Sequence, residues 1–296
     1  MNLRQMEVFR AIMRTGSITG AARSLNISQP SVTGMLKHTE SSIGFRLFER
    51  VKGKLIATAE AERLYDEVDT LFERVQMVSQ SVDELREGRL GTLRIVTLAS
   101  LSLSVIPSLL GRFIQSRPGI RVRLLQKRRS ELIEMVARGA ADLGVSFHNK
   151  NDSRIIRHEL SRKGLSCIMP IGHPLTMKQE LTVEDLREFP LVGYAVTDGF
   201  GSMVNGMIEE ARLSHQRTAE VDGVVQAWAL VEGGAGIGLV DGFSDLRNLY
   251  PHVELRPLQS RLAFSLDVIV PAHEKLSQMS TMFLKTLPDH KKSSAK

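Results

Sequence analysis

The sequence has 296 residues, of which 42% are hydrophobic, and a single cysteine, Cys167, which excludes an internal disulfide. A chain of this length and composition can form about two globular domains. It contains no run of the roughly 20 apolar residues that a membrane helix needs, and Arg4, Glu7 and Arg10 interrupt the start where a signal peptide would be apolar, so we expect a cytoplasmic protein with no membrane partner.

The net charge of +6 is unevenly distributed along the chain. Residues 1–58 hold nine Lys and Arg against three Asp and Glu, residues 59–87 hold three against nine, and residues 88–296 hold 27 against 21. A dense positive charge on a short segment is typical of a surface that contacts phosphate groups. A solvated basic face is the alternative explanation.

Residues 16–50 have the pattern of two short helices joined by a tight turn. Ser17 is placed to cap the first helix and Ser28 the second, and Pro30 stands in the first turn of the second helix, where its missing N–H costs no hydrogen bond. The outward residues of the second helix are of the types that bond base edges or phosphates: Gln29, Ser31, Thr33 and Lys37. The pattern therefore predicts a helix-turn-helix that reads DNA, and a helical hairpin without a DNA role is the alternative.

A basic turn follows the second helix. Arg50, Lys52 and Lys54 surround Gly53, as expected for a wing whose cations touch phosphates and displace counterions. A wing of this kind would extend the contact surface of the reading helix along the DNA backbone.

The first 60 or so residues resemble the winged helix-turn-helix domain of the LysR-type transcriptional regulators. The residues that carry the resemblance are Leu3, Phe9, Gly16-Ser17, Ala21-Ala22, Leu25, Ser28-Gln29-Pro30-Ser31, Glu40, Gly44, Leu47-Phe48, Arg50 and Thr58. Gly34 stands where the family usually has Arg, so an expected DNA contact is missing, and a helical Gly also costs ~1 kcal/mol relative to Ala. Thr39 stands where Leu is usual, which weakens a core contact.

From residue 59 to residue 87 the chain contains no Pro or Gly, and its apolar residues alternate spacings of four and three. These residues are Leu64, Val68, Leu71, Val75, Val78, Val82 and Leu85. The heptad pattern predicts one long helix whose apolar seam is buried against a second copy, so we expect at least a dimer; packing onto its own chain is the alternative. Gly88 and Gly91 would then end the helix and form a hinge.

Beyond the hinge, strands and helices alternate, which predicts an α/β domain with a mainly parallel sheet. The expected elements are a strand over 92–98, a helix over 103–115, a strand over 120–125 and a helix over 131–138. The glycine-rich residues 233–238 follow a helix and precede a strand, so we interpret them as a tight turn and not as a nucleotide loop. Cys167 is expected to be buried and His173 to stand in a turn. With no nucleophile, metal-ligand or cofactor motif, we expect no enzyme, metal or cofactor.

This C-terminal half resembles the effector domain of the same family, which has the two-lobed fold of periplasmic binding proteins of type 2. The matching phrases include Arg117-Pro118, Asp142-Leu143-Gly144-Val145, His173-Pro174-Leu175, Pro190-Leu191-Val192 and Gly236-Ile237-Gly238-Leu239-Val240. The implied fold class is α/β with an all-α winged helix-turn-helix over residues 1–58, a linker helix over 59–87 and a two-lobed effector domain over 88–296. The implied partners are double-stranded promoter DNA, a small-molecule inducer, RNA polymerase and further copies in a homodimer or homotetramer.

In such folds, ligands are held between the lobes by helix N-termini and by polar residues just past strand ends. The residues of this chain expected there are Ser100, Ser102, Arg129, Ser130, Thr197, Ser202 and Asp222. Arg129 replaces the Ser or Thr usual in the family, and a guanidinium binds a carboxylate bidentately, while Asp222 would meet an amine. We therefore expect an inducer that is a carboxylate or an amino-acid derivative. Two alternatives are that Arg129 and Asp222 pair with each other, or that Arg129 joins Lys127 and Arg128 on a solvated edge.

Within the family, the chain most resembles the regulators of opine (octopine and nopaline) catabolism, through its first five residues and the phrase from Leu230 to Ile237. An opine-like inducer follows as a hypothesis. Other functions left open are an architectural DNA-binding repressor without ligand control and, less supported, a bilobed solute-binding protein or enzyme.

Overall fold

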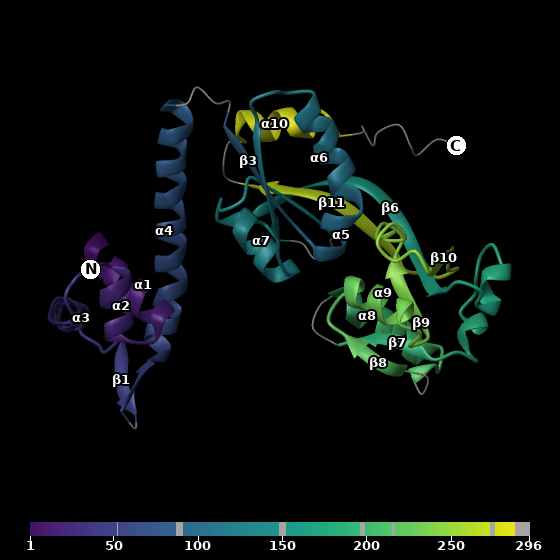
Figure 1. Cartoon of the computed structure of the whole chain (residues 1–296), viewed down its shortest axis with the longest axis horizontal. Helices are drawn as coiled ribbons and strands as arrows, with labels where there is room; N and C mark the ends of the chain where they lie inside the picture. Colours follow the sequence, from purple (N-terminus) through teal and green to yellow (C-terminus); the bar gives the residue numbers. More distant parts are fainter. Residues whose placement is uncertain are drawn as a thin grey trace. The chain divides into compact units, whose positions relative to one another are not determined.

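The computed structural model describes residues 1–51, 53–86, 91–147, 152–195, 199–214, 217–272 and 276–287. The chain forms two compact units, Met1–Glu87 and Gly88–Lys296 (Figure 1). We expected residues 59–87 as a linker between two domains, and in the structure they belong to the first compact unit. Among the described residues, no helix is both long and apolar enough to cross a membrane.

The first unit is a small helical bundle with a β-hairpin. Its elements are α1 (Leu3–Thr15), α2 (Ile18–Ser24), α3 (Gln29–Ile43), β1 (Phe48–Val51), β2 (Lys54–Ala57) and α4 (Ala59–Arg86). Strands β1 and β2 pair antiparallel, so the predicted wing is a hairpin. The turn of the hairpin contains Gly53 at φ +80°, a left-handed conformation that glycine adopts without strain.

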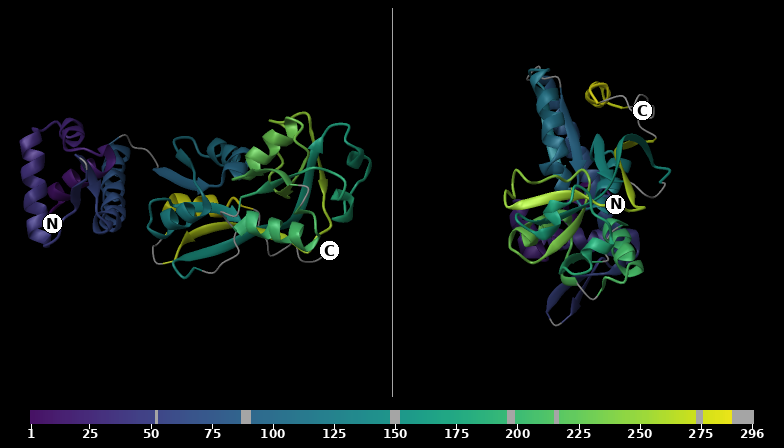
Figure 2. Two further views of the ribbon diagram at one scale, coloured as in Figure 1. Left: turned by 90° about the horizontal axis from the view of Figure 1, so that it is seen from below. Right: turned by 90° about the vertical axis from the view of Figure 1, so that its right-hand side faces the viewer.

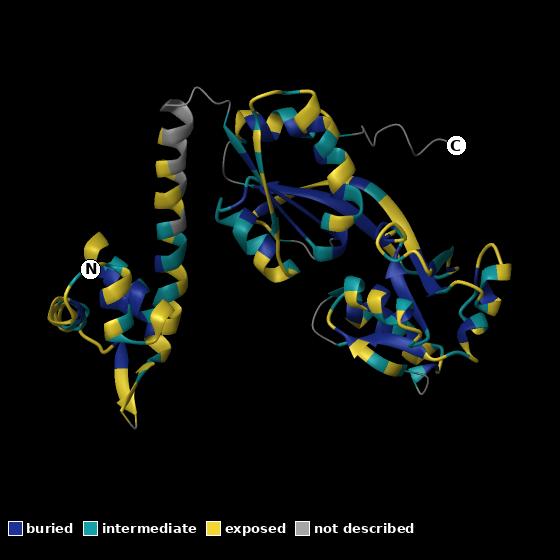
Figure 3. Cartoon of the chain, viewed as in Figure 1, coloured by how far each residue is buried: buried dark blue, intermediate teal, exposed yellow. Residues whose placement is uncertain are grey.

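The core of the first unit lies where α1, α3 and α4 meet. Helix α1 starts with a capping box, in which Asn2 accepts the N–H of Gln5 at 2.9 Å and Gln5 accepts the N–H of Asn2 at 2.7 Å. Its inner face buries Phe9 and Ile12 completely, and α4 covers that face with Val68, which is 3% exposed. Such burial, more than helix propensity, stabilises helices of this length. Figure 3 marks the buried residues in dark blue.

The second unit consists of two lobes. The first lobe contains β3 (Thr92–Thr97), α5 (Ala99–Leu103), α6 (Val105–Gln115), β4 (Arg121–Gln126), α7 (Arg129–Ala137), β5 (Leu143–Phe147), the first part of β6 (Ile155–Pro170), β11 (Ala263–Pro271) and α10 (Gln278–Leu284). The second lobe contains the rest of β6, η1 (Pro174–Met177), η2 (Glu184–Leu186), β7 (Leu191–Tyr194), α8 (Gly199–Glu210), β8 (Arg217–Val221), α9 (Val224–Glu232), β9 (Ile237–Asp241) and β10 (Val253–Pro257). Figures 1 and 2 show these two lobes.

Strand β6 belongs to both lobes and joins them. Its residues 155–164 pair with β11, and its residues 165–170 pair with β9 and β10. Among the described residues the strands follow the order β4-β3-β5-β11-β6-β9-β7-β8, with β10 added on β6. The lobes are therefore connected by continuous hydrogen-bonded strand and not only by loops.

The predicted mainly parallel sheet is right for part of each lobe. Strand β3 is parallel to β4 and β5, and β7 is parallel to β8 and β9. The remaining pairs are antiparallel: β6 with β9, β10 and β11, and β11 with β5. The predicted helix over 103–115 is confirmed as α6, which begins at Val105, and Ser104 (φ −112°, ψ −84°) separates it from the additional short helix α5.

Three local predictions about the second lobe are confirmed. Gly236 lies in the turn between α9 and β9 at φ +123°, and a Cβ there would come within 2.2 Å of the Pro190 carbonyl oxygen, so only glycine is accommodated. Cys167 is completely buried, and burial raises the pKa of its thiol. His173 caps η1, where its Nδ1 accepts the N–H of Leu175 at 3.3 Å.

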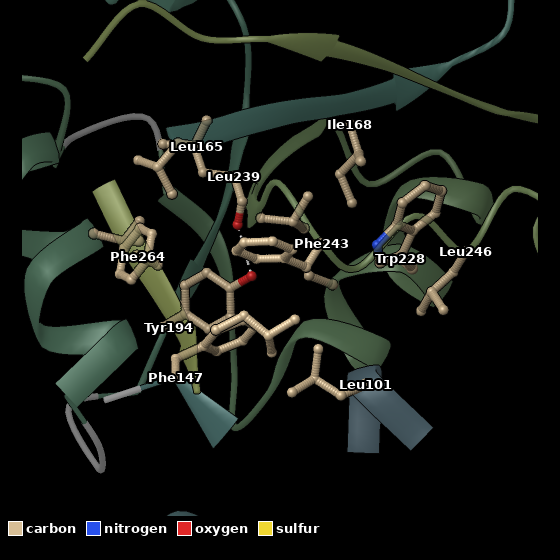
Figure 4. Packing of buried hydrophobic residues seen from close by; sticks show 14 of the residues in the cluster. Leu101, Phe147, Leu165, Ile168, Tyr194, Trp228, Leu239, Phe243, Leu246 and Phe264 are labelled. Carbon is tan, nitrogen blue, oxygen red and sulfur yellow. Dashed lines mark hydrogen bonds between the residues drawn. The ribbon is translucent and has the colours of Figure 1, made fainter. Parts of the chain in front are cut away.

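One hydrophobic cluster extends through both lobes. Figure 4 shows its centre, where Leu101 of α5 and Phe147 of β5 lie near Tyr194 and Phe243 of the second lobe. The Tyr194 hydroxyl donates to the carbonyl oxygen of Leu239 at 2.7 Å, so this buried polar group is satisfied. Because the cluster is continuous, packing changes in one lobe reach the other.

Candidate DNA-binding surface and ligand cavity

The turn between α2 and α3 is fixed by the two predicted caps. Ser17 accepts the N–H of Gly20 at 3.0 Å, and Ser28 accepts the N–H of Ser31 at 3.3 Å. Between them Asn26 adopts φ +52°, a left-handed conformation that asparagine tolerates better than most residues. The caps and this residue hold α3 at a set angle to α2.

The outward face of α3 carries the predicted reading residues. Gln29, Ser31 and Lys37 are exposed and Thr33 is half-buried. The Gln29 amide oxygen accepts the Thr19 hydroxyl at 3.4 Å, and the Thr33 hydroxyl donates to the Gln29 carbonyl at 3.0 Å. Gln29 is therefore held from two sides in the first turn of α3, the part of a recognition helix that reaches base edges.

The two departures from the family pattern have different consequences. Gly34 is exposed, its φ is ordinary, and nothing lies within 4 Å of an added Cβ, so the position would accept a side chain. Thr39 is 1% exposed, and its hydroxyl donates to the carbonyl of Met35 at 2.8 Å. The buried hydroxyl of Thr39 therefore has a hydrogen-bond partner within its own helix. Its side chain takes the position in the core that Leu usually occupies in the family.

The wing presents cations to solvent. Arg50 and Lys54 are exposed on β1 and β2, and Lys52 lies outside the described residues. The hairpin is anchored by Phe48, which is 9% exposed and packs its ring 6.0 Å from that of Phe9. The basic residues are therefore carried on a rigid support.

The seam of α4 divides into a covered and an uncovered part. Leu64 and Val68 pack into the core of the first unit. For these two residues the seam therefore packs onto its own chain, which was the alternative to dimerisation. The uncovered members are Leu71, Val75, Val78 and Val82, which are 38%, 39%, 66% and 45% exposed. The side chain of Leu85 lies outside the described residues. An apolar stripe along the end of α4 thus remains for a partner.

A cavity of about 460 Å³ lies between the two lobes of the second unit, within the size range of small-molecule sites. Four of the predicted ligand contacts line it: Ser100, Arg129, Ser130 and Asp222. They come from the starts of α5 and α7 and from the residue two places before α9. The first residues of α7 and α9 also line the cavity, so the positive N-terminal ends of both helices lie beside it.

The remaining predicted contacts lie elsewhere. Ser102 and Ser202 are not among the residues that line the cavity. Ser102 is in α5, where its hydroxyl donates to the carbonyl of Ala99 at 2.7 Å. Ser202 lies in the first turn of α8, where its side chain is exposed. Thr197 lies outside the described residues.

The charged side chains of the cavity are grouped at the start of α7. Lys127 pairs with Glu131 at 2.9 Å, and Arg128 lies 3.9 Å from Asp222, both as exposed pairs. Arg129 is half-buried, and its Nη1 lies 2.6 Å from where a Cβ would stand on Gly199. The Arg129 guanidinium therefore extends from the first lobe to the first residue of α8 in the second lobe.

The cavity has an apolar wall that the sequence did not suggest. Its members are Leu98, Ile133, Phe147, Tyr194, Phe200 and Val224. They come from separate elements of both lobes, and no local motif joins them. Sequence reasoning looks for polar residues at strand ends, so it finds one side of such a site and misses the other.

The chain was compared with known families and structures. A family model described as bacterial regulatory helix-turn-helix protein, lysR family, matches residues 3–62, and one described as LysR substrate binding domain matches residues 86–292. Together the two matches include both the α2–α3 surface and the cavity.

Two characterised relatives match nearly the full length. The transcriptional activator protein LysR of Escherichia coli (strain K12) is 30% identical over 283 residues, which are 96% of this chain and 91% of that protein. The regulatory protein NocR of Agrobacterium fabrum (strain C58 / ATCC 33970) is 28% identical over 270 residues, 91% of this chain and 87% of that protein.

The fold matches full-length structures as well. The crystal structure of CbnR, a LysR family transcriptional regulator, has a TM-score of 0.78 at 20% identity and covers 98% of this chain and 100% of that one. The structure of full-length CbnR complexed with its target DNA has the same TM-score at 19% identity, with 97% and 99% coverage. At these identities the likeness concerns the fold alone.

Proposed function

Because the chain belongs to the LysR family of DNA-binding transcriptional regulators, we propose that it reads promoter DNA with α3 and its wing, and that a small carboxylate bound between the effector lobes adjusts that binding. We assign the effector domain to residues 88–296, which include the two lobes; the match to the LysR substrate binding domain over residues 86–292 supports this assignment. In this assignment Gln29, Ser31 and Thr33 meet base edges, and Lys37, Arg50, Lys52 and Lys54 meet phosphates. Ser17 and Ser28 hold the two helices in place.

The observation that carries the ligand part of the proposal is the position of Arg129. Its guanidinium is half-buried in the cavity wall, beside the uncapped N-terminus of α7 and against the first residue of α8. A carboxylate placed there would receive charge-assisted hydrogen bonds from a planar donor pair. An amino-acid or opine-type carboxylate is the first class to test, because the octopine catabolism/uptake operon regulatory protein OccR of Rhizobium meliloti is 29% identical to this chain over 249 residues.

We further propose that two copies pair through the uncovered apolar stripe of α4, and that dimers assemble into a homotetramer on DNA. An exposed row of apolar side chains on a long helix supports this, since such a row is normally covered. Contact with RNA polymerase and action in the cytoplasm follow from a regulator's role at a promoter.

The proposal is tested by separating the two activities. Arg129→Ala should lose about 2 to 5 kcal/mol of carboxylate binding, because the ligand charge is left desolvated and unpaired, and should retain DNA binding without ligand. Isothermal calorimetry with a panel of amino acids and opines measures the first, and fluorescence anisotropy on the DNA upstream of the gene measures the second.

Arg123→Ala is the matched control, because Arg123 is an exposed arginine on β4 of the same lobe and does not line the cavity. Equal carboxylate affinity in the wild type and the Arg129 variant would remove Arg129 from the site. DNA binding that never responds to any ligand would instead support an architectural repressor.

A further inference from the structure

The cations of the cavity come from one lobe, whereas its apolar side chains come from both lobes. The first lobe supplies the cations at the start of α7 together with the hydroxyls of Ser100 and Ser130. The second lobe supplies the side chains of Tyr194, Phe200 and Val224, and its acidic residue Asp222 lies at the rim with its side chain 57% exposed. The first lobe also supplies Leu98, Ile133 and Phe147, so a ligand between the lobes meets cations at the start of α7 and apolar side chains from both lobes.

The hydroxyl proton of Tyr194 is already used within the second lobe and is not offered to a ligand. Its hydroxyl proton is donated to the Leu239 carbonyl at 2.7 Å, away from the ring face. The ring of Tyr194 meets Phe200 edge-on with 5.2 Å between centroids, and Phe147 stands on the opposite lobe. A polar ligand group against these rings would lose its water without gaining a partner, which is unfavourable.

Phe200 also connects the cavity to the strands that join the lobes. Its ring centroid lies 5.1 Å from that of Phe264 on β11, and Phe264 in turn lies 6.3 Å from Phe147. Phe200 is half-buried, whereas Phe147 and Phe264 are buried. Phe200 is therefore the member of this aromatic cluster that retains exposed surface in the cavity while it packs on the inter-lobe strand.

We infer that the effector is an amphipathic monocarboxylate, with its carboxylate at Arg129 and an aromatic or branched apolar body against Phe200, and that Phe200 selects for that body. The inference rests on the proposed function, since it names the class of ligand for the same cavity. Burial of the apolar body under the second lobe then favours the closed arrangement of the lobes, because the hydrophobic gain is realised only when both walls cover it. A second carboxylate or a guanidinium on the ligand would be placed against the rings and disfavoured.

The test compares probes that differ in one end only. These are 3-phenylpropionate, 4-methylpentanoate, glutarate and 3-phenylpropan-1-ol, measured by calorimetry and by the shift of Tm with the full-length protein. The two apolar monocarboxylates should bind at least ten-fold more tightly than glutarate. The alcohol, which lacks the carboxylate, should bind weakly and should not respond to Arg129→Ala.

The variants assign the selectivity to Phe200. Phe200→Ala should weaken 3-phenylpropionate at least ten-fold and change glutarate binding by less than two-fold, and Phe200→Leu, which keeps most of the apolar volume, should lose less. Phe189→Ala is the matched control, because Phe189 is a half-buried phenylalanine of the same lobe that packs on His173 outside the cavity. An unchanged unliganded Tm and DNA affinity verify that each variant is folded.

Two results would overturn the inference alone, and a third would overturn the proposed function with it. Glutarate or an opine that binds through Arg129 more tightly than the apolar monocarboxylates would refute the apolar body and leave a carboxylate-responsive regulator. Loss of 3-phenylpropionate binding that is equal in the Phe200 and Phe189 variants would refute the role of Phe200. Binding of all probes that is indifferent to Arg129→Ala would refute the carboxylate site itself.

Discussion

The Glu40 carboxylate of α3 accepts the backbone N–H of Leu47, with 2.7 Å between Oε1 and N. The same oxygen accepts the N–H of Phe48 at 3.2 Å, and both residues are buried at the start of the wing. Thr58 closes the other end of the hairpin by donating to the Arg46 carbonyl at 3.0 Å. The reading helix and the wing are thereby tied into one body.

Glu40→Ala should destabilise the first unit by about 1 to 3 kcal/mol, because it leaves two buried N–H donors without an acceptor. Thermal and urea unfolding of the full-length protein measure the loss. Glu40→Gln keeps a carbonyl oxygen in the same place and should lose much less. Equal losses in the two variants would mean that the negative charge, and not the hydrogen bonds, stabilises the contact.

Gln29→Ala and Lys54→Ala should weaken DNA binding in different ways. Loss of a base contact at Gln29 should cost about 1 to 3 kcal/mol at one base position, whereas loss of a phosphate contact at Lys54 should weaken all sequences and reduce the salt slope by about 1. Footprinting and salt titrations on wild-type and mutated operators separate the two. A uniform loss in both variants would contradict the division between reading and positioning residues.

Replacing Leu71 and Val75 with Asp should split the dimer, because each change would bury an unpaired charge in the seam. These positions are chosen because their side chains are 38% and 39% exposed in the single chain, unlike Val68, whose replacement would disturb the core of the first unit. Sedimentation equilibrium measures the outcome. Gln76→Asp, on the exposed surface of the same helix, is the control. An intact dimer in the double variant would rule out this seam.

Asp241→Asn should remove a pH dependence of stability. Asp241 is completely buried at the end of β9, and burial raises its pKa from 3.8 to about 6, against the hydrogen bonds that it accepts from Phe243 and Ser244. The folded state then binds the Asp241 proton more tightly than the unfolded state does. The protonated carboxyl therefore contributes fully to the free energy of unfolding below pH 3.8, and this contribution is lost as the pH rises to about 6. The free energy of unfolding lost in this way is roughly 3 kcal/mol, because each pKa unit corresponds to about 1.36 kcal/mol.

The asparagine amide is expected to fit this position. Its Oδ1 can accept both N–H groups, and its Nδ2 can donate to the Ser244 hydroxyl, which in the wild type lies 2.7 Å from Oδ2 of Asp241. The Asn variant should therefore gain stability relative to the wild type between pH 4 and pH 7, measured by urea unfolding across that range. Asp241→Ala, which orphans the donors, should be less stable at every pH. A constant difference between Asn and wild type would show that Asp241 does not titrate in this window.

The parts of the fold that depend on local chemistry were predictable from the sequence. The caps at Ser17 and Ser28 and the glycine turn at Gly236 each follow from a few adjacent residues, and the structure confirms them. The bond from Glu40 to Leu47 was out of reach, because a carboxylate in a helix gives no sign of which distant N–H it accepts. The sequence hinted at this bond only in that Glu40 and Leu47 both belong to the residues that carry the family resemblance.

The ligand site was predictable only in part, for the same physical reason. Arg129 and Asp222 were placed correctly on the cavity because polar residues at helix starts are marked by their neighbours. Ser202 does not line the cavity, because it lies in the first turn of α8 and the side on which a helical residue falls depends on where the helix begins. The aromatic wall depends on tertiary packing of strands from both lobes.

The strand order of the effector domain also constrains the sequence of events in its synthesis. Strand β11 lies between β5 and β6 in the sheet, yet it follows the whole second lobe in the chain. The first lobe therefore cannot complete its sheet until Pro271 has left the ribosome, whereas residues 165–258 of the second lobe are contiguous and can pair as they emerge. Until then β5 presents an open edge, so a chain that stopped before Ala263 would expose a strand that pairs readily with other chains. Slow translation across the last strands would prolong that exposure and make it the step at which this protein is most prone to aggregate.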